Sequence, residues 1–270
     1  MAIDQSPLGR ATSYPSQYAP ELLFPIARDL SREQLPKPVP VFYGFDIWTG
    51  YEISWLDASG KPSVAIAEFR VPCESQCIIE SKSFKLYLNS YNQSRFASTD
   101  EVIQRMEQDL SAAAGAQVAV QFFALDEYLP CNSVKGVCLD QLPLDNPLYH
   151  PDSSLLRLGE GAQVDECVYS DLLKTNCPVT GQPDWASVII HYRGRPIDHQ
   201  SLLAYIVSFR EHQDFHEHCV ERMFADIMQV CLPEYLSVYA RYTRRGGLDI
   251  NPYRSSAPGR QPETVRLFRQ

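Results

Sequence analysis

Alternating hydrophobic and polar residues predict strands in the first half of the chain. The segment GYEISWLDASGKPSVAIAEFR, residues 50–70, contains two alternating runs around a turn with glycine, a pattern typical of a β-hairpin. The segment STDEVIQRMEQDLSAAA, residues 98–114, begins with a capping-box sequence and continues with apolar residues at helical spacing. Residues 116–125, AQVAVQFFAL, return to a β-rich pattern. The first half therefore reads as hairpin, helix and strand.

The same pattern recurs in the second half. SVAIAEFR (63–70) corresponds to SVIIHYRG (187–194), and SFKLYLNSY (83–91) corresponds to SLLAYIVSF (201–209). An amphipathic segment and then a β-rich segment follow in each copy, DFHEHCVERMFADIMQV and EYLSVYARY in the second. Each half reads strand, strand, helix, helix, strand, with room for a fourth strand. This order predicts an α+β fold in which antiparallel sheets carry helices on one face.

Proline-rich and serine-rich stretches suggest the domain boundaries. Residues 1–38 are expected to form an N-terminal arm, and residues 142–161 are expected to link the two halves. The first module then spans residues 39–141 and the second spans residues 162–270.

Composition and charge exclude several classes of function. The 270 residues are 44% hydrophobic, as in a soluble globular protein, and the formal net charge of −9 disfavours a general binder of nucleic acid or membrane surfaces. The sequence shows no apolar run of membrane-spanning length and no signal-peptide pattern at its start, so we expect a cytoplasmic protein. The eight cysteines are expected to be free thiols, and their spacing matches no structural zinc site. No metal is expected.

Cys177 is the candidate nucleophile. It lies in CPVTGQPD, a loop with two prolines and a glycine that ends in Asp184 just before an apolar, strand-like run. A loop can present a thiolate to a pocket, and a desolvated aspartate can donate a proton. The alternative is that Cys177 is an inert, buried filler, which is the commoner fate of cysteine.

Carboxylates beside two helix starts form a second set of candidates. His216 and Glu217 lie in DFHEH, and Glu80 lies ahead of the first copy's helix. A buried glutamate suits a guanine-like edge, because N1–H and the 2-amino group present two parallel donors to one carboxylate. The alternative is a solvated, acidic first helical turn.

Two basic clusters indicate an anionic ligand. Lys82 and Lys85 share one helix face near its start, and RRGG at residues 244–247 combines arginines with glycines that permit close backbone approach. Scattered surface residues are the alternative for either cluster alone. The sequence has no G-x-G-x-x-G after a strand, so a nucleotide cofactor would not be held in a Rossmann fold.

Taken together, the motifs resemble those of the NADPH-dependent 7-cyano-7-deazaguanine reductases, the nitrile reductases of queuosine biosynthesis, in their long two-module form. The resemblance covers residues 40–260 and is carried by ESKSFKLY, NCPVTGQPDW, FHEHCVERMFADI and RRGGLDINP in this order. It implies tandem tunnelling-fold modules, related to pterin and purine enzymes, and a homodimer. Neither a nucleic-acid partner nor a membrane is implied.

The resemblance also implies roles for single residues. Cys177 would add to the nitrile carbon to form a thioimide, and Asp184 would protonate the nitrile nitrogen. His216 would be the third catalytic residue. The residues implied for binding 7-cyano-7-deazaguanine are Ile79, Glu80, Ser81, Phe215, His216 and Glu217. The residues implied for binding NADPH are Ser81, Lys82, Lys85, Arg245 and Gly246.

Two other functions remain open from the residues alone. A cysteine-dependent hydrolase or a cyclohydrolase-like enzyme acting on a purine or pterin would share the thiol and the carboxylates but would not use NADPH. A non-catalytic protein of the same fold could bind such a ring without reacting with it.

Overall fold

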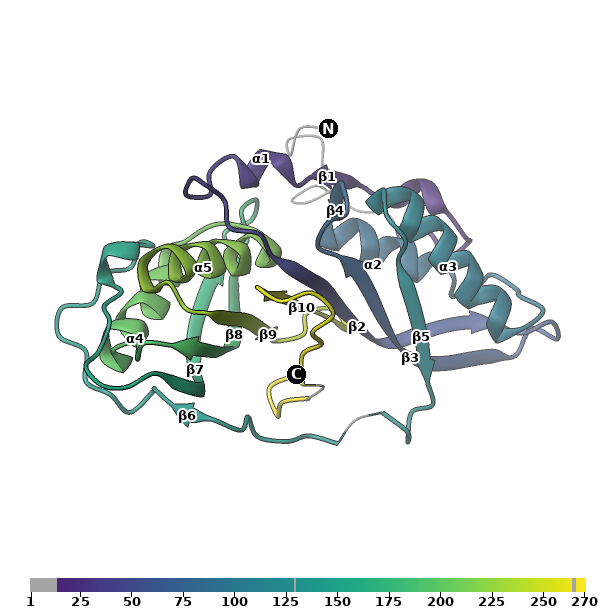
Figure 1. Ribbon diagram of the computed structural model, residues 1–270. Coiled ribbons are helices and arrows are strands. Elements are labelled where there is room, and N and C mark those ends of the chain that lie inside the picture. Colours follow the sequence, from purple (N-terminus) through teal and green to yellow (C-terminus); the bar gives the residue numbers. More distant parts are fainter. Residues whose placement is uncertain (1–13, 129, 264–265) are drawn as a thin grey trace. The chain divides into compact units, whose positions relative to one another are not determined.

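The computed structural model describes residues 14–128, 130–263 and 266–270, so the first part of the predicted N-terminal arm lies outside the described residues. The chain divides into two compact units (Figure 1). Among the described residues, unit 1 comprises 14–30, 46–128 and 244–249, and unit 2 comprises 31–45, 130–243 and the residues from 250 onward. Each unit is therefore built from separate stretches of the chain.

Unit 1 contains an antiparallel sheet with helices on one side of it. Its strands follow the order β5 (Ala119–Phe123), β3 (Pro62–Pro72) and β2 (Tyr43–Leu56), of which β2 begins in unit 2. The helices α2 (Ser81–Ser90) and α3 (Thr99–Ala114) lie on the same side of this sheet (Figure 1). Aromatic rings fill the space between the layers, with the ring centroids of Trp48 and Phe69 each 5.0 Å from that of Phe84. Burial of these large rings stabilises the contact between α2 and the sheet.

The helix α3 begins and ends where its sequence signals predict. The Ser98 hydroxyl accepts a hydrogen bond from the Glu101 N–H, and Gly115 ends the helix in the left-handed conformation with φ +70°. The Glu101 carboxylate accepts from the Ala97 N–H at 2.8 Å, one residue before the Ser98 N–H that a capping box would use.

Residues 15–27, which we call the strap, lie along α2. The backbone N–H groups of Tyr18, Ala19 and Phe24 donate to the hydroxyls of Ser94, Ser90 and Ser83 respectively, at 2.7–3.2 Å. The strap also contains the short 3-10 helix η2 (Pro20–Leu22) and the strand β1 (Pro25–Ala27), which pairs antiparallel with β4 (Cys77–Ile79). The described part of the predicted arm is therefore divided, since residues 14–30 belong to unit 1 and residues 31–38 belong to unit 2. The short helix α1 (Asp29–Arg32) follows the strap at this boundary.

Unit 2 repeats the arrangement of a sheet with helices on one side. Its strands follow the order β10 (Leu248–Ser255), β9 (Tyr235–Tyr242), β8 (Pro183–Gly194), β7 (Val164–Asn176) and β6 (Val137–Cys138). All neighbouring pairs are antiparallel except β6 and β7, which are parallel. The helices α4 (His199–Ser208) and α5 (His216–Cys231) cover one side of the sheet, with the 3-10 helix η4 (Phe209–Glu211) between them and η3 (Ser153–Leu155) earlier in the chain (Figure 1).

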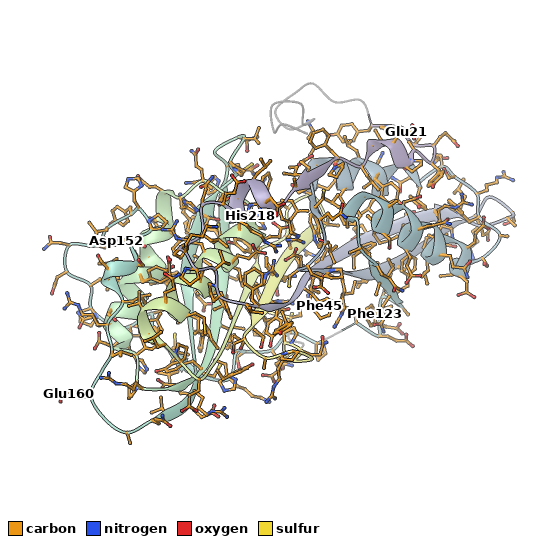
Figure 2. All side chains as sticks on the ribbon, turned by 45° about the horizontal axis from the view of Figure 1, so that its top comes forward. Glu21, Phe45, Phe123, Asp152, Glu160 and His218 are labelled. Atoms are coloured by element: carbon orange, nitrogen blue, oxygen red, sulfur yellow. The ribbon has the colours of Figure 1, made fainter. Side chains whose placement is uncertain are left out.

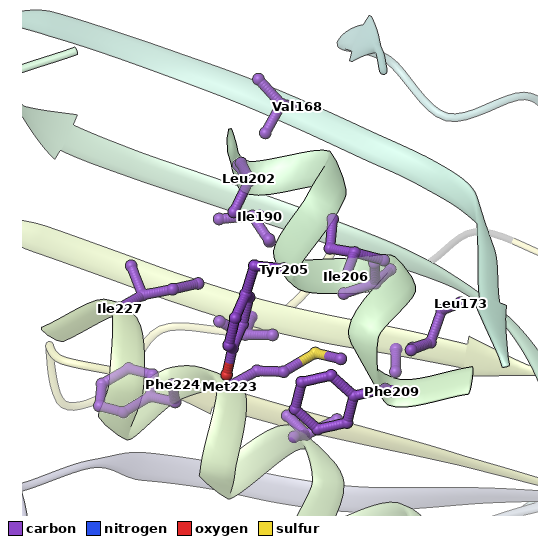
Figure 3. Packing of buried hydrophobic residues seen from close by; sticks show 14 of the residues in the cluster. Val168, Leu173, Ile190, Leu202, Tyr205, Ile206, Phe209, Met223, Phe224 and Ile227 are labelled. Carbon is purple, nitrogen blue, oxygen red and sulfur yellow. The ribbon is translucent and has the colours of Figure 1, made fainter. Parts of the chain in front are cut away.

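The core of unit 2 lies between this sheet and its two helices. Tyr205 from α4, Phe209 from η4, Met223 and Phe224 from α5 and Ile190 from β8 meet there (Figure 3), and all are fully buried. Side chains at every second position of β8, from Ala186 to Tyr192, belong to this core, as strand geometry requires. The predicted α+β class with antiparallel sheets and helices is confirmed, and the internal repeat appears as helix pairs of equal length, 10 residues for α2 and α4 and 16 for α3 and α5.

Within the part of the chain that the structure describes, no helix is both long enough and apolar enough to cross a membrane.

Candidate active site

The loop between β7 and β8 holds Cys177 at the end of a strand. The Cys177 N–H donates to the Gln182 carbonyl at 2.9 Å, and the Gly181 N–H donates to the Cys177 carbonyl at 3.0 Å. Gly181 has φ +66°, a left-handed conformation that glycine adopts without strain. These bonds close the loop tightly and leave Cys177 8% exposed. The backbone of Cys177 is therefore held in place directly after the last residue of β7.

Asp184 is the second residue of the neighbouring strand β8. In the register of β7 and β8 it is opposite Thr175, and it is 5% exposed. The Nε2 atom of His216, the first residue of α5, lies 3.4 Å from its Oδ2 atom. The structure therefore brings together a thiol-bearing strand end, a buried carboxylate and an imidazole from three different elements. A buried carboxylate beside an imidazole can hold and transfer a proton.

An aromatic ring fixes the orientation of His216. Its imidazole stacks on the Tyr242 ring of β9, with centroids 3.7 Å apart and planes at 4°. Burial raises the pKa of Tyr242 well above its ordinary value, so this tyrosine stays neutral in the physiological range. The sequence contains no local signal for this contact, because Tyr242 lies in a different strand and reaches His216 only through the fold.

Glu217 follows His216 in the first turn of α5 and is buried. Its exposed fraction is 3%, so a solvated first turn is not what the structure shows at this position. Phe215 precedes the helix as its N-cap residue and makes no side-chain capping bond. Its ring contacts that of His218, with centroids 5.8 Å apart.

In unit 1, Glu80 caps the helix α2. Its carboxylate accepts hydrogen bonds from the N–H groups of Lys82 at 2.6 Å and Ser83 at 2.8 Å. Burial raises the pKa of Glu80, and these two bonds partly oppose that shift. Ile79 is buried at the end of β4, and Ser81 begins the helix. The capping bonds account for the position of Glu80, and its predicted role in substrate binding stays a prediction.

The predicted cofactor residues of unit 1 meet beside a small cavity. Gly246 has φ +60° in the turn before β10, and a Cβ atom added to it would lie 3.4 Å from Cδ of Lys85. The cavity has a volume of about 230 Å³, and its polar lining includes Glu52, Lys85, Asn89 and Asn92. A lysine, two amides and an open glycine backbone suit a phosphate group, whereas a whole dinucleotide needs more room. The residues thus fit part of NADPH.

The other predicted cofactor residues are close in sequence to residues that line this cavity. Ser81 and Lys82 occupy the first turn of α2, which also carries Lys85. Arg245 immediately precedes Gly246, and its backbone N–H donates to the Leu248 carbonyl at 2.8 Å. Within the described part of the chain, no group of three or more histidine, cysteine, aspartate or glutamate residues could hold a metal ion.

Two family models match this chain. Residues 14–122 match a model described as "Nitrile reductase, 7-cyano-7-deazaguanine-reductase N-term", and residues 183–260 match one described as "QueF-like protein". Cys177 lies between the two matched ranges, and the other four predicted site residues of unit 2, Asp184, Phe215, His216 and Glu217, lie in the second.

Curated relatives resemble the chain along its whole length. A protein of Bordetella pertussis named NADPH-dependent 7-cyano-7-deazaguanine reductase is 53% identical over 274 residues, covering 100% of both chains. A protein of the same name from Burkholderia multivorans is 55% identical over 272 residues and covers 99% of both. A solved structure titled "Crystal structure of the archaeosine synthase QueF-Like in the apo form" is 18% identical and covers 38% of this chain and 100% of its own, but its TM-score of 0.32 is too low to define a common fold. By its full-length similarity, this chain belongs to the family of NADPH-dependent 7-cyano-7-deazaguanine reductases.

Proposed function

We propose that this chain reduces the nitrile of 7-cyano-7-deazaguanine to the aminomethyl group of 7-aminomethyl-7-deazaguanine with NADPH, as a step of queuosine biosynthesis. Membership of the family supports the overall reaction. The observation that supports the chemistry is the 3.4 Å distance between Asp184 and His216, at the end of the β7–β8 pair where Cys177 follows the last residue of β7.

The proposed first step is addition of the Cys177 thiolate to the nitrile carbon. A C–S bond forms, one π bond of the nitrile breaks, and its electron pair takes a proton on nitrogen from Asp184, giving a covalent thioimide. His216 holds the Asp184 carboxyl group through Nε2 and can return a proton to it. NADPH, when bound, would supply hydride to the carbon of the C=N group, at the thioimide and at the imine that forms when the C–S bond breaks. Cys177 leaves as a thiolate and is ready for another turnover.

Recognition of the deazaguanine ring is assigned to other side chains. Glu217, buried at the start of α5, would accept from the two parallel N–H donors of the ring edge. Phe215 and His216 directly precede Glu217 in the chain and would contact the ring. The resemblance assigns Ile79, Glu80 and Ser81 of unit 1 to the same ligand.

Binding of NADPH is assigned to the residues around the small cavity of unit 1. Lys82 and Lys85 would neutralise phosphate charge, and the Arg245–Gly246 turn would let the cofactor approach the backbone. Ser81 completes this set. The family resemblance further suggests a cytoplasmic homodimer that binds neither nucleic acid nor membranes, and light scattering after gel filtration would measure its mass.

The direct test is to mix the purified protein with 7-cyano-7-deazaguanine and NADPH and to follow nicotinamide absorbance together with the product mass. Because conversion of a nitrile to an amine takes four electrons and places two protons on nitrogen, the second proton also being taken through Asp184, we expect two NADPH to be consumed for each aminomethyl product. A ratio of one would show that the imine escapes. A hydrolase would instead change the nitrile without oxidising NADPH, and a simple binding protein would leave both unchanged.

A second test addresses the cofactor residues. Lys85→Ala should raise the KM for NADPH roughly 10-fold, because a hydrogen bond to a charged group contributes about 1.5 kcal/mol or more. Formation of the thioimide without NADPH should keep its wild-type rate. Lys61→Ala, which removes an exposed lysine from the hairpin turn of the same unit, is the matched control and should change neither quantity. An unchanged KM in Lys85→Ala would remove this residue from the cofactor site.

A further inference from the structure

The strand end that carries Cys177 is bonded to the segment that leads into α5. Asn176, the last residue of β7, donates its backbone N–H to the His212 carbonyl at 2.8 Å and accepts from the Asp214 N–H at 3.2 Å. This pair of bonds forms an isolated parallel bridge between Asn176 and Gln213. Cys177 therefore follows directly after a residue that is bonded on both sides to residues 212–214.

The side chain of Asp214 continues this connection into the helix. Its Oδ1 atom accepts from the Phe215 N–H at 2.7 Å and lies 3.2 Å from Nδ1 of His218, which is labelled in Figure 2. Its Oδ2 atom lies 3.6 Å from Nε2 of His212. One carboxylate thus contacts residues on both sides of itself, and the two that it joins to the helix, Phe215 and His218, flank His216 and Glu217.

The surroundings keep this carboxylate charged and in place. Burial alone would raise the pKa of Asp214, but hydrogen bonds with His212 and His218 outweigh it and lower the pKa below the ordinary value. A cavity of about 20 Å³, room for about one water molecule, lies beside this cluster. The Asp214 side chain is 22% exposed, so its contacts with Phe215, His212 and His218 hold it in place.

A comparison with α4 shows that Asp214 is more than an ordinary helix cap. Asp198 is the N-cap residue of α4, and its carboxylate accepts from the Ser201 N–H at 2.8 Å. At α5 the N-cap position is taken by Phe215, and the aspartate stands one residue earlier, bonded to the N-cap N–H and to the His218 ring. Because the aspartate stands one residue earlier, its carboxylate also lies beside His212, whose carbonyl accepts the N–H of Asn176 at the end of β7.

We propose that Asp214 is a positioning residue, whose contacts with Phe215, His212 and His218 hold the start of α5 at a fixed distance from the strand end that carries Cys177. The inference rests on the proposed function. Under it, Glu217 and His216 bind the ring while Cys177 attacks its nitrile, so the distance between these groups decides how often thiol and nitrile are aligned. A misplacement of about 1 Å can slow such a step about 100-fold.

The test measures thioimide formation from 7-cyano-7-deazaguanine without NADPH, at increasing nitrile concentration, by rapid mixing and mass spectrometry. Asp214→Ala should lower the maximal rate about 100-fold, while the half-saturating nitrile concentration should stay within about 3-fold of wild type because Glu217 is retained. Asp214→Asn keeps an oxygen for the Phe215 N–H and should recover part of the rate, to about 10-fold below wild type. A general loss of stability would not lower the maximal rate while leaving the half-saturating nitrile concentration unchanged.

The matched control is Asp198→Ala, which removes a helix cap from the same unit and should keep the wild-type rate. Hydrogen exchange supplies a readout that needs no substrate, since Asp214→Ala should speed amide exchange at Asn176 and Phe215 while Asp198→Ala should not. If the wild type forms no thioimide, the proposed function fails. The exchange data would still show whether Asp214 holds the start of α5 against the end of β7. The inference is overturned if Asp214→Ala or Asp214→Asn reacts at the wild-type rate, or if exchange at Asn176 is unchanged.

Discussion

Cys177→Ala is expected to show no reduction of 7-cyano-7-deazaguanine and no covalent adduct. Without the thiol the nitrile cannot become a thioimide, and a free nitrile is a poor acceptor of hydride. The variant should still bind the nitrile base, because the proposed mechanism assigns recognition of the ring to Glu217 and activation of the nitrile to a different residue. Mass spectrometry of the wild type without NADPH should show an adduct of the full substrate mass, because addition to a nitrile expels no leaving group.

Other thiols of unit 2 provide the controls for this experiment. Burial raises the pKa of Cys167, with the charges of Glu263 and Glu166 adding to the shift, and burial raises the pKa of Cys231 to about 11. Burial also raises the pKa of Cys219 well above its ordinary value. A raised pKa means less thiolate at neutral pH, so these three cysteines are poor nucleophiles. Cys167→Ala should therefore form the adduct normally, and an adduct found on Cys167 or Cys219 would overturn the assignment of Cys177.

Asp184→Asn should lower the rate of reduction about 100-fold or more, the loss typical of removing a general acid. The amide has nearly the same shape as the carboxyl group, so it can keep a contact with His216, but it has no acidic proton for the nitrile nitrogen. A 100-fold loss corresponds to about 2.7 kcal/mol of transition-state stabilisation. Single-turnover measurements should show the defect in thioimide formation itself, before any hydride is transferred.

A second aspartate–histidine pair in the same unit makes a matched control. Oδ1 of Asp165 lies 2.6 Å from Nε2 of His191, and both side chains are substantially exposed. Asp165→Asn removes a carboxylate from a comparable pair outside the proposed site and should leave the rate within 2-fold or so of wild type. If Asp184→Asn behaves like Asp165→Asn, the proton comes from another group.

Local sequence signals predicted much of the fold, because hairpins, caps and helix periodicity depend on neighbouring residues. The helix α3 follows its capping sequence, and the repeat predicted two helices in each half, which the structure shows with matching lengths. The strap and the parallel strand β6 were not predicted. Both depend on contacts with residues far along the chain, such as the bond from Phe24 to Ser83, and the strap sequence shows only a proline-rich segment.

The candidate site divides in the same way. Cys177, Asp184, His216 and Glu217 could be chosen from the sequence because each belongs to a short motif. The stacking of Tyr242 on His216 could not, because it joins a strand and a helix that only the fold brings together. Asp214 did carry a signal, since an aspartate just before an apolar periodic segment often marks a helix start, but its bonds to two histidines required the coordinates.

Unit 1 is built from separate stretches of the chain, and this limits where the gene could be split into two genes. Residues 244–249 follow residues 130–243 of unit 2 in the sequence, yet they belong to unit 1, where the Gly247 carbonyl accepts from the Tyr51 N–H at 2.9 Å and Gly246 lies beside Lys85. A split between the two halves of the gene would leave the first product without the turn that lines its own cavity. Fission into two independent genes would thus have to restore that turn in trans, which favours inheritance of the duplicated chain as a single reading frame.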